Sequence, residues 1–200
     1  ESAIENHPNQ PFPYFAKGFA LNVKKEFTEA LSELEKGKEL VIENSLLESD
    51  FYHQIAEAHY NLNVLAKSFE NFEIALSLNP ENLILINNYS YYLALNKQNL
   101  ERAEKLIIKA VSLSPRNSTY LDTYGWVLFQ KEKYEEAEEI IFKAVMNSGE
   151  KVGEIIEHYG DVMFKLGKPE EALLFWNKAK KTGNYTNNLS LKLKQKKYVD

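Results

Sequence analysis

Small and large apolar residues recur at helical spacing along most of the chain. Five segments share one pattern, in which a small residue is followed four positions later by a large apolar one and three positions after that by another small one. The five sets are Ala30/Leu34/Gly37, Ser68/Phe72/Ala75, Ala103/Ile107/Ala110, Ala137/Ile141/Ala144 and Ala172/Trp176/Ala179. Residues at i, i+4 and i+7 lie on one face of an α-helix. The pattern therefore predicts five helices, each burying a large residue between small ones that let a neighbouring helix approach.

A second helix is predicted ahead of each of these five. Its own small residue is, from the first unit to the fifth, Gly18, Ala56, Ser90, Gly125 and Gly160. The last two steps of this series are 35 residues each. An alanine followed five residues later by proline recurs at Ala3/Pro8, Ala75/Pro80 and Ala110/Pro115. Because proline cannot continue a helix, each unit is expected to run helix A, turn, helix B, turn.

Units of this length and order resemble the tetratricopeptide repeat (TPR). The resemblance covers nearly the whole chain and implies an all-α fold, a right-handed superhelical solenoid of about five helix pairs. The units by this register are 11–48, 49–82, 83–117, 118–152 and 153–185, with 1–10 as the tail of a truncated preceding repeat and 186–200 as a capping helix. The first helix B is expected to run on through "KELVIENSLL" (38–47). Residues 1–8 suggest that the chain was cut from a longer array.

Composition narrows the chemistry. The chain has no cysteine, which excludes disulfides, thiol catalysis and cysteine-ligated zinc. The net charge of −5 disfavours nucleic acid and anionic membrane surfaces as partners. Four lysines near the end, Lys192, Lys194, Lys196 and Lys197, are interpreted as a solvated face of the capping helix. No apolar run has the length of a membrane span.

The stretch "IIEHYGDVMF" (155–164) concentrates charge on one helix face. Glu154, Glu157, His158 and Asp161 lie at i, i+3, i+4 and i+7. Helical spacing would allow His158 and two carboxylates to bind a metal. The scaffold interpretation is favoured, because the other histidines lie far along the array and nothing supplies a nucleophile or a closed pocket. No enzyme activity, metal or cofactor is expected.

The TPR resemblance assigns one face of each helix A to a concave, partner-binding groove. The candidate positions are His53, Glu57, Tyr60, Asn87, Asn88, Tyr91, Asp122, Trp126, Phe129, Glu157, Asp161 and Phe164, with Glu154 beside them. Asparagine can hydrogen-bond a peptide backbone as donor and acceptor, and aromatic residues are typical interface anchors. The alternative for Tyr91, Trp126 and Phe129 is packing against the next helix A, whereas Trp176 is assigned to the core.

The charge of these positions bears on the partner. TPR domains that hold acidic C-terminal peptides of chaperones use a basic clamp, and the groove positions here almost lack lysine and arginine, with Lys165 the nearest. A protein or peptide partner that is neutral, apolar or basic is therefore expected, and nucleic acid is not.

Four segments in this order resemble a narrower family: "LINNYSYYLAL" (85–95), "STYLDTYGWVLFQKEKYEEA" (118–137), "IIEHYGDVMFKLGKPEEALLFWNKA" (155–179) and "LKLKQKKYVD" (191–200). They are similar to the C-terminal half of a TPR family of Bacteroidetes and, more distantly, to proteobacterial envelope TPR lipoproteins. That resemblance implies an exported precursor, a place in the periplasm or cell envelope rather than the cytoplasm, and an adaptor role. In the proteobacterial relatives the role includes presenting substrates to a periplasmic protease.

Two other functions stay open at this point. The sequence is also compatible with the accessory TPR region of a larger protein that has a catalytic or assembly domain upstream. It is compatible, too, with a structural element that self-associates through the ends of the solenoid. In that case a homodimer could reflect the truncated N-terminal repeat, because the cut exposes an unpaired apolar helix face.

Overall fold

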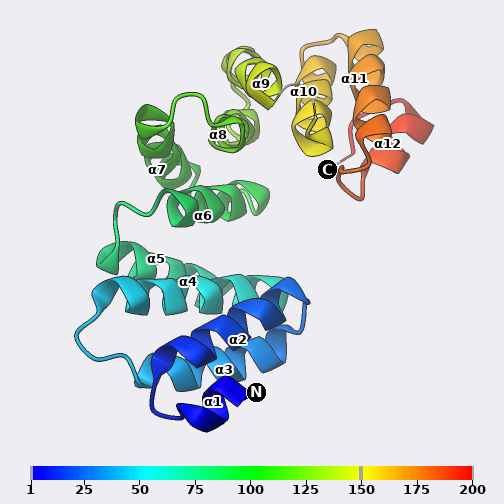
Figure 1. Cartoon of the computed structure of the whole chain (residues 1–200). Helices are drawn as coiled ribbons and strands as arrows, with labels where there is room; N and C mark the ends of the chain where they lie inside the picture. Colours follow the sequence, from blue (N-terminus) through cyan, green and yellow to red (C-terminus); the bar gives the residue numbers. More distant parts are fainter. Residues whose placement is uncertain (1, 149–150, 200) are drawn as a thin grey trace. The chain divides into compact units, whose positions relative to one another are not determined.

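The computed structural model describes residues 2–148 and 151–199, which form twelve α-helices (Figure 1). The chain divides into two compact units, Glu1–Ile86 and Asn87–Asp200. The first unit contains α1 (Ser2–Asn6), α2 (Pro11–Val23), α3 (Phe27–Glu39), α4 (Ser45–Asn61), α5 (Leu65–Leu78) and the start of α6 (Leu83–Leu95). The second contains the rest of α6, then α7 (Leu100–Leu113), α8 (Ser118–Gln130), α9 (Tyr134–Ser148), α10 (Gly153–Lys165), α11 (Pro169–Thr182) and α12 (Leu189–Gln195). Successive helices form antiparallel pairs, as the sequence predicted.

The small–large–small faces of the B helices form the core. All fifteen residues of the five predicted sets are buried. In the first unit, Leu34 packs with Ala30, Phe51 and Ile55. Its partner on helix A is Gly18, where an added Cβ would lie 2.4 Å from Cγ of Leu34. The large residue of helix B therefore fills the space that the small residue of helix A leaves.

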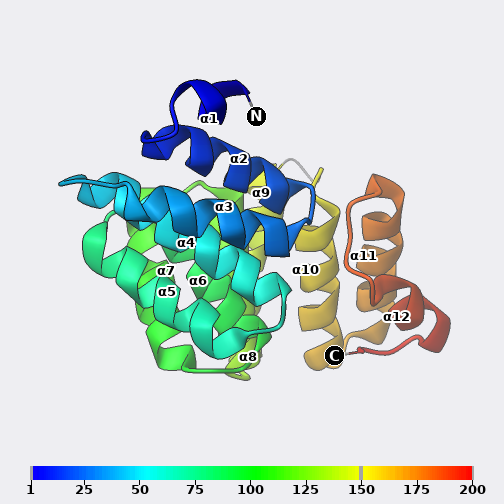
Figure 2. The same cartoon turned by 90° about the horizontal axis from the view of Figure 1, so that it is seen from below.

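The second unit repeats this fit twice more. A Cβ added at Gly125 of α8 would lie 2.2 Å from Cγ1 of Ile141 on α9. At Gly160 of α10 it would lie 2.6 Å from Cδ1 of Trp176 on α11. Trp176 is fully buried, which confirms its assignment to the core. In Figures 1 and 2, α10, α11 and α12 lie side by side, and the C-terminal end of the chain lies beside α10.

The prediction that the first helix B runs on through residues 38–47 is wrong. Helix α3 ends at Glu39 and α4 begins at Ser45. Between them Glu43 has φ +47°, which leaves the helical path, and the Asn44 side chain accepts a hydrogen bond from the Leu47 N–H. Such an N-cap stabilises a new helix start. Helix α4 therefore begins four residues before residue 49, whereas α2, α6, α8 and α10 begin at the first residues of their expected units.

Each A helix ends in the same left-handed turn. The residues with positive φ are Lys25, Asn63, Lys97, Glu132 and Gly167, and the next N–H in each turn donates back to the carbonyl of Leu21, His59, Leu93, Leu128 or Met163. This six-to-one hydrogen bond defines the Schellman motif, which satisfies carbonyls at a helix C-terminus. The short turn then directs helix B back along helix A.

Candidate functional site

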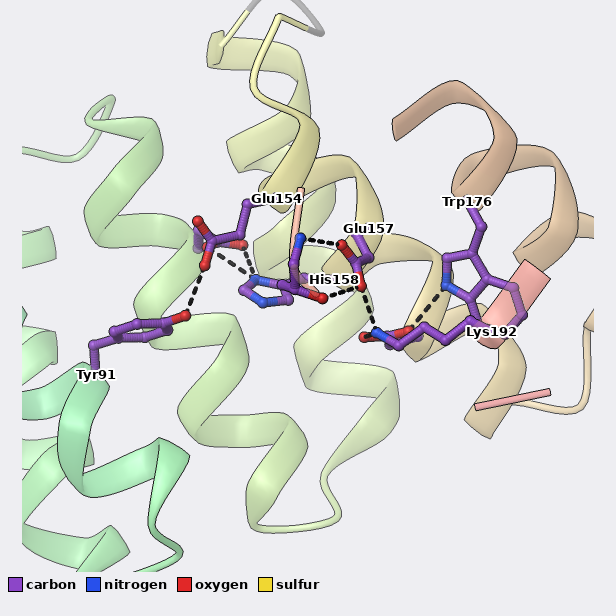
Figure 3. A network of polar contacts seen from close by, with 9 residues as sticks. Tyr91, Glu154, Glu157, His158, Trp176 and Lys192 are labelled. Carbon is purple, nitrogen blue, oxygen red and sulfur yellow. Dashed lines mark hydrogen bonds and ion pairs between the residues drawn. The ribbon is translucent and has the colours of Figure 1, made fainter. Parts of the chain in front are cut away.

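Helix α10 is the most completely buried helix of the second unit, and its charged residues lie inside. Glu157 and Asp161 are fully buried, and His158 is 2% exposed. Figure 3 shows His158 and Glu157 between Tyr91 of α6 on one side and Lys192 of α12 on the other. Buried charges require partners, because water can no longer solvate them. Their partners therefore define what this helix can bind.

His158 is paired with Asp122 of α8. Its Nδ1 lies 3.0 Å from both carboxylate oxygens of Asp122. Burial alone would lower the pKa of His158, but the charge and hydrogen bond of Asp122, together with Glu154 and Asp161, outweigh burial and raise that pKa to about 9. The imidazole is therefore a cation at neutral pH.

An aromatic stack continues from His158 along α8. The Trp126 ring stacks on His158 with centroids 4.1 Å apart, and Phe129 stacks on Trp126 at 4.8 Å. Phe129 then meets Tyr198, near the end of the chain, at 5.5 Å. Trp126 and Phe129 are 6% and 3% exposed. Trp126 thus packs against α10, the next helix A, whereas Phe129 packs against Trp126 and Tyr198.

The C-terminal segment, defined here as residues 186–199 and including α12, lies against α10. Nζ of Lys192 donates to Oε1 of Glu157 at 2.7 Å and to Oδ2 of Asp161 at 2.6 Å (Figure 3). The backbone N–H and hydroxyl of Thr186 donate to Glu157 at 2.8 and 2.5 Å. The two fully buried carboxylates of α10 are thus held by the chain's own basic segment.

Asp161 has a second partner from the core. Nε1 of Trp176 donates to its Oδ1 at 2.9 Å. Burial raises the pKa of Asp161 to about 6, against the opposite effects of Lys192 and His158, while Glu157 raises it further. Two buried carboxylates therefore share one ammonium.

A cavity of about 190 Å³ remains between α6, α8, α10 and the C-terminal segment. The part of α6 from Asn87 on, with α8 and α10, is called the helix-A wall below. The cavity is lined by Tyr91, Leu95, Trp126, Gln130, His158 and Asp161 of the helix-A wall and by Thr186, Asn188, Lys192, Tyr198 and Val199 of the C-terminal segment. The Tyr91 hydroxyl donates to Oε1 of Glu154 at 2.7 Å, which ties α6 to α10. The C-terminal segment thus covers one side of the helix-A wall and encloses the cavity between them.

Two polar atoms of the helix-A wall are buried without a hydrogen-bond partner among the described residues. They are Nε1 of Trp126, a donor, and Oδ1 of Asn87, an acceptor. An unsatisfied buried polar atom is costly and calls for an explanation such as a ligand. Trp126 lines the cavity, and Asn87 lies one helical turn before Tyr91.

The remaining predicted residues lie outside this pocket. In the first unit His53 is buried, with Nε2 3.4 Å from Oε1 of Glu57, and Tyr60 is half-buried on the same helix. Phe164, near the end of α10, stacks on the Trp176 ring at 5.8 Å. Nδ2 of Asn87 donates to Oδ1 of Asn88 at 3.4 Å.

The sequence-based interpretation missed the residues of the C-terminal segment. The prediction that Lys192 belongs to a solvated face is wrong, because Lys192 is 3% exposed and paired with two carboxylates. One signal was available: Lys192 lies three residues after Leu189, so the two share a helix face. Leu189 is fully buried, and it brings Lys192 to α10.

His158 and the two buried carboxylates of α10 have separate partners. Across residues 2–148 and 151–199, no group of three or more His, Cys, Asp or Glu side chains is arranged to hold a metal ion. His158 turns to Asp122, while Glu157 and Asp161 turn to Lys192. Within the same residues, no helix is both long and apolar enough to cross a membrane.

Comparisons with known proteins identify the fold. No protein-family model and no curated protein sequence matches the chain. Among solved structures, Pseudomonas aeruginosa PilF matches with a TM-score of 0.74 at 19% identity, over 92% of this chain and 83% of that one. The thermophilic TPR protein TTC0263 of Thermus thermophilus matches with a TM-score of 0.74 at 17% identity, over 93% and 98% of the two chains.

A further match describes a binding protein. YrrB, whose structure is that of a TPR protein with an unusual peptide-binding site, matches with a TM-score of 0.67 at 21% identity, over 97% of this chain and 96% of that one. Likeness at this level of identity establishes architecture rather than activity. The chain has the all-α fold of TPR solenoid proteins.

Proposed function

We propose that this protein is a non-enzymatic adaptor that binds an extended peptide segment of a partner protein on the helix-A wall of the second unit. The observation that carries the proposal is the buried Nε1 of Trp126, a donor without an acceptor among the described residues, in a residue that lines the cavity. Asn87 adds an acceptor without a donor on the neighbouring helix. A peptide backbone offers both a carbonyl oxygen and an N–H, so one extended segment would satisfy both atoms.

The size and walls of the cavity support a peptide over a small-molecule substrate. A volume of about 190 Å³ is below the roughly 300–1,000 Å³ of typical small-molecule pockets. Trp126, Tyr91 and Leu95 provide apolar surface, and Gln130 and Asn188 provide amides. This combination suits one side chain of a longer segment, with the rest lying along the wall. YrrB, a structural relative, is described as having a peptide-binding site.

The charges of the wall support a neutral, apolar or basic ligand. Asp122, Glu157 and Asp161 each hold a cation in the structure, either His158 or Lys192. An acidic segment would meet these carboxylates with like charge.

The narrower resemblance extends the proposal to location and context. Similarity of residues 85–95, 118–137, 155–179 and 191–200 to the Bacteroidetes family supports a place in the periplasm or cell envelope. An accessory role beside a catalytic or assembly domain of a longer protein is the second candidate. It is compatible with the same wall, because the wall would then recruit a substrate for the neighbouring domain.

A random twelve-residue peptide library displayed on phage would test the adaptor proposal. Peptides selected on the full chain would be synthesised, and their Kd values measured for wild type and for Trp126→Phe, which keeps an aromatic ring but removes Nε1–H. We expect Trp126→Phe and Asn87→Ala each to weaken binding at least five-fold, with Ile108→Ala on exposed α7 surface as the unaffected control. Unchanged Kd values in both wall variants would move the binding surface away from the helix-A wall.

A further inference from the structure

We propose that Glu157 and Asp161 form a lysine-binding site that the chain's own Lys192 fills, and that a lysine-bearing segment of a partner takes this place by displacing the C-terminal segment. The inference rests on the proposed function, since it concerns the same helix-A wall and names the chemistry of the ligand. The inference goes beyond the proposed function in one respect. The cavity beside the helix-A wall is the form of the site covered by the C-terminal segment, and displacement of the segment opens a larger site.

The site is built for an ammonium group. Two carboxylates one helical turn apart on α10 reach Nζ of Lys192 at 2.7 and 2.6 Å. Asp161 is also fixed by the indole N–H of Trp176, which lies outside the C-terminal segment, whereas the other donor to Glu157, the backbone N–H of Thr186, belongs to the segment and leaves with it. The Tyr198 ring covers the ammonium, with its centroid 5.5 Å from Nζ. Because Trp176 holds Asp161 in place before the cation arrives, this carboxylate loses little freedom when the cation binds.

The segment that supplies this lysine contacts the wall chiefly through four side chains, those of Thr186, Leu189, Lys192 and Tyr198. Helix α12 has seven residues, of which only Leu189 and Lys192 are buried. A helix of this length is not stable by itself in water, so its structure depends on those two anchors. The chain just before the segment is fixed, because the Asn184 carbonyl packs against Gly153, where an added Cβ would lie 2.1 Å away. Detachment of the segment therefore begins beyond a fixed point.

Displacement of the C-terminal segment favours a ligand that carries a lysine. When Lys192 leaves, two fully buried carboxylates lose their shared cation, which is strongly unfavourable. A neutral segment would leave them unpaired and an acidic one would add repulsion. A segment with a lysine restores the pairing and can bring apolar residues to the face that Leu189 covers. The displaced segment, with Leu189 and Lys192 three positions apart, itself shows the arrangement that fits.

Peptide binding in trans tests this inference directly. The probe is a synthetic peptide of residues 186–199, TNNLSLKLKQKKYV, and the control peptide has glutamine at position 192. Both are titrated against the full wild-type chain and against full chains carrying Lys192→Gln or Leu189→Ala. The Leu189→Ala chain loosens α12 while all charges stay. Circular dichroism would reveal whether Lys192→Gln impairs folding. If it does, the Leu189→Ala chain still tests whether release of the segment exposes the site.

The expected result follows from competition within the chain. A tethered segment competes at an effective concentration on the order of millimolar, so its release exposes the site to an external peptide. We expect the lysine peptide to bind both variants at least ten-fold more tightly than wild type, and the glutamine peptide to show no such gain. Equal binding of the two peptides, or equal binding to all three chains, would overturn the inference.

The oligomeric state of the wild-type chain gives a second result that would contradict the inference. Dimers of the wild-type chain that exchange α12 between copies, seen by sedimentation, would also overturn the inference, because a second copy would then be the occupant. The adaptor proposal fails separately, when the Trp126→Phe and Asn87→Ala variants keep full affinity for library peptides whatever the lysine peptides do.

Discussion

At the residue scale, the most informative group is His158. It lies inside the protein as a cation, although burial by itself favours the neutral form. The pairing with Asp122 at 3.0 Å and the stacking on Trp126 at 4.1 Å together fix the ring. A residue that in the sequence resembles a metal ligand or a catalytic base thus connects two neighbouring A helices and holds the indole of the proposed binding wall in place.

The pH dependence of stability should reveal this cation. The pKa of His158 is raised from 6.5 to about 9 on folding, so its stabilising contribution is complete below pH 6.5 and is lost as pH rises through 9. The loss should be on the order of 3 kcal/mol. Urea unfolding at pH 6.5 and 9.5 measures it. Asp161, with a pKa of about 6, titrates below this window. A His158→Gln chain should lack the dependence, and an equally steep decline in that variant would refute the assignment.

Gly125 offers a direct test of the packing between helices A and B, in which a large residue of helix B fills the space left by a small residue of helix A. A Cβ there would lie 2.2 Å from Cγ1 of Ile141, which is fully buried. We expect Gly125→Ala to lower the free energy of unfolding by about 1–3 kcal/mol through overpacking. Chemical denaturation measures this change, with Ser112→Ala on exposed α7 surface as the control. A variant as stable as wild type would mean that α8 and α9 are not packed in this register.

At the element scale, the repeated unit is a helix pair closed by a Schellman turn. The sequence predicts the pairs well because their signal is redundant: the same spacing of small and large residues occurs five times, and every such residue is buried. The break between α3 and α4 was missed because it depends on one left-handed residue, Glu43, and one capping side chain, Asn44. Neither interrupts the apolar pattern.

The left-handed turn positions lead to a prediction about stability. Gly167 has φ +75° and no atom near the place of an added Cβ, so substitution there tests backbone conformation alone. Gly167→Ala should cost about 1–2 kcal/mol, because a side chain disfavours the left-handed region. Thermal unfolding of the variant measures the loss, and an unchanged melting temperature would contradict the Schellman assignment at this turn.

The lysine site could be predicted only in part. The sequence places Glu157 and Asp161 on one helix face and Lys192 on an amphipathic segment. It does not show that α12 turns this lysine inward, because lysine in such a pattern is usually solvated. The contact joins residues 31 and 35 positions apart, and tertiary packing decides it. The unpaired Nε1 of Trp126 likewise becomes visible only with the fold.

At the scale of the whole molecule, the proposed binding features belong to the second unit. The first unit has its own core around Leu34 and Phe51, and its predicted groove residues include the buried His53 paired with the half-buried Glu57. In the second unit the wall, the cavity and the C-terminal segment come together. A partner that binds there is expected to contact α6, α8 and α10 and to free the segment that covers them.

Hydrogen exchange of the full chain, with and without a saturating library-selected peptide that contains lysine, tests this account most directly. The account predicts slower amide exchange in α6, α8 and α10 and faster exchange in residues 186–199, because the peptide replaces the C-terminal segment on the wall. Retained protection of residues 186–199, with new protection confined to the outer surfaces of α7, α9 or α11, would contradict it.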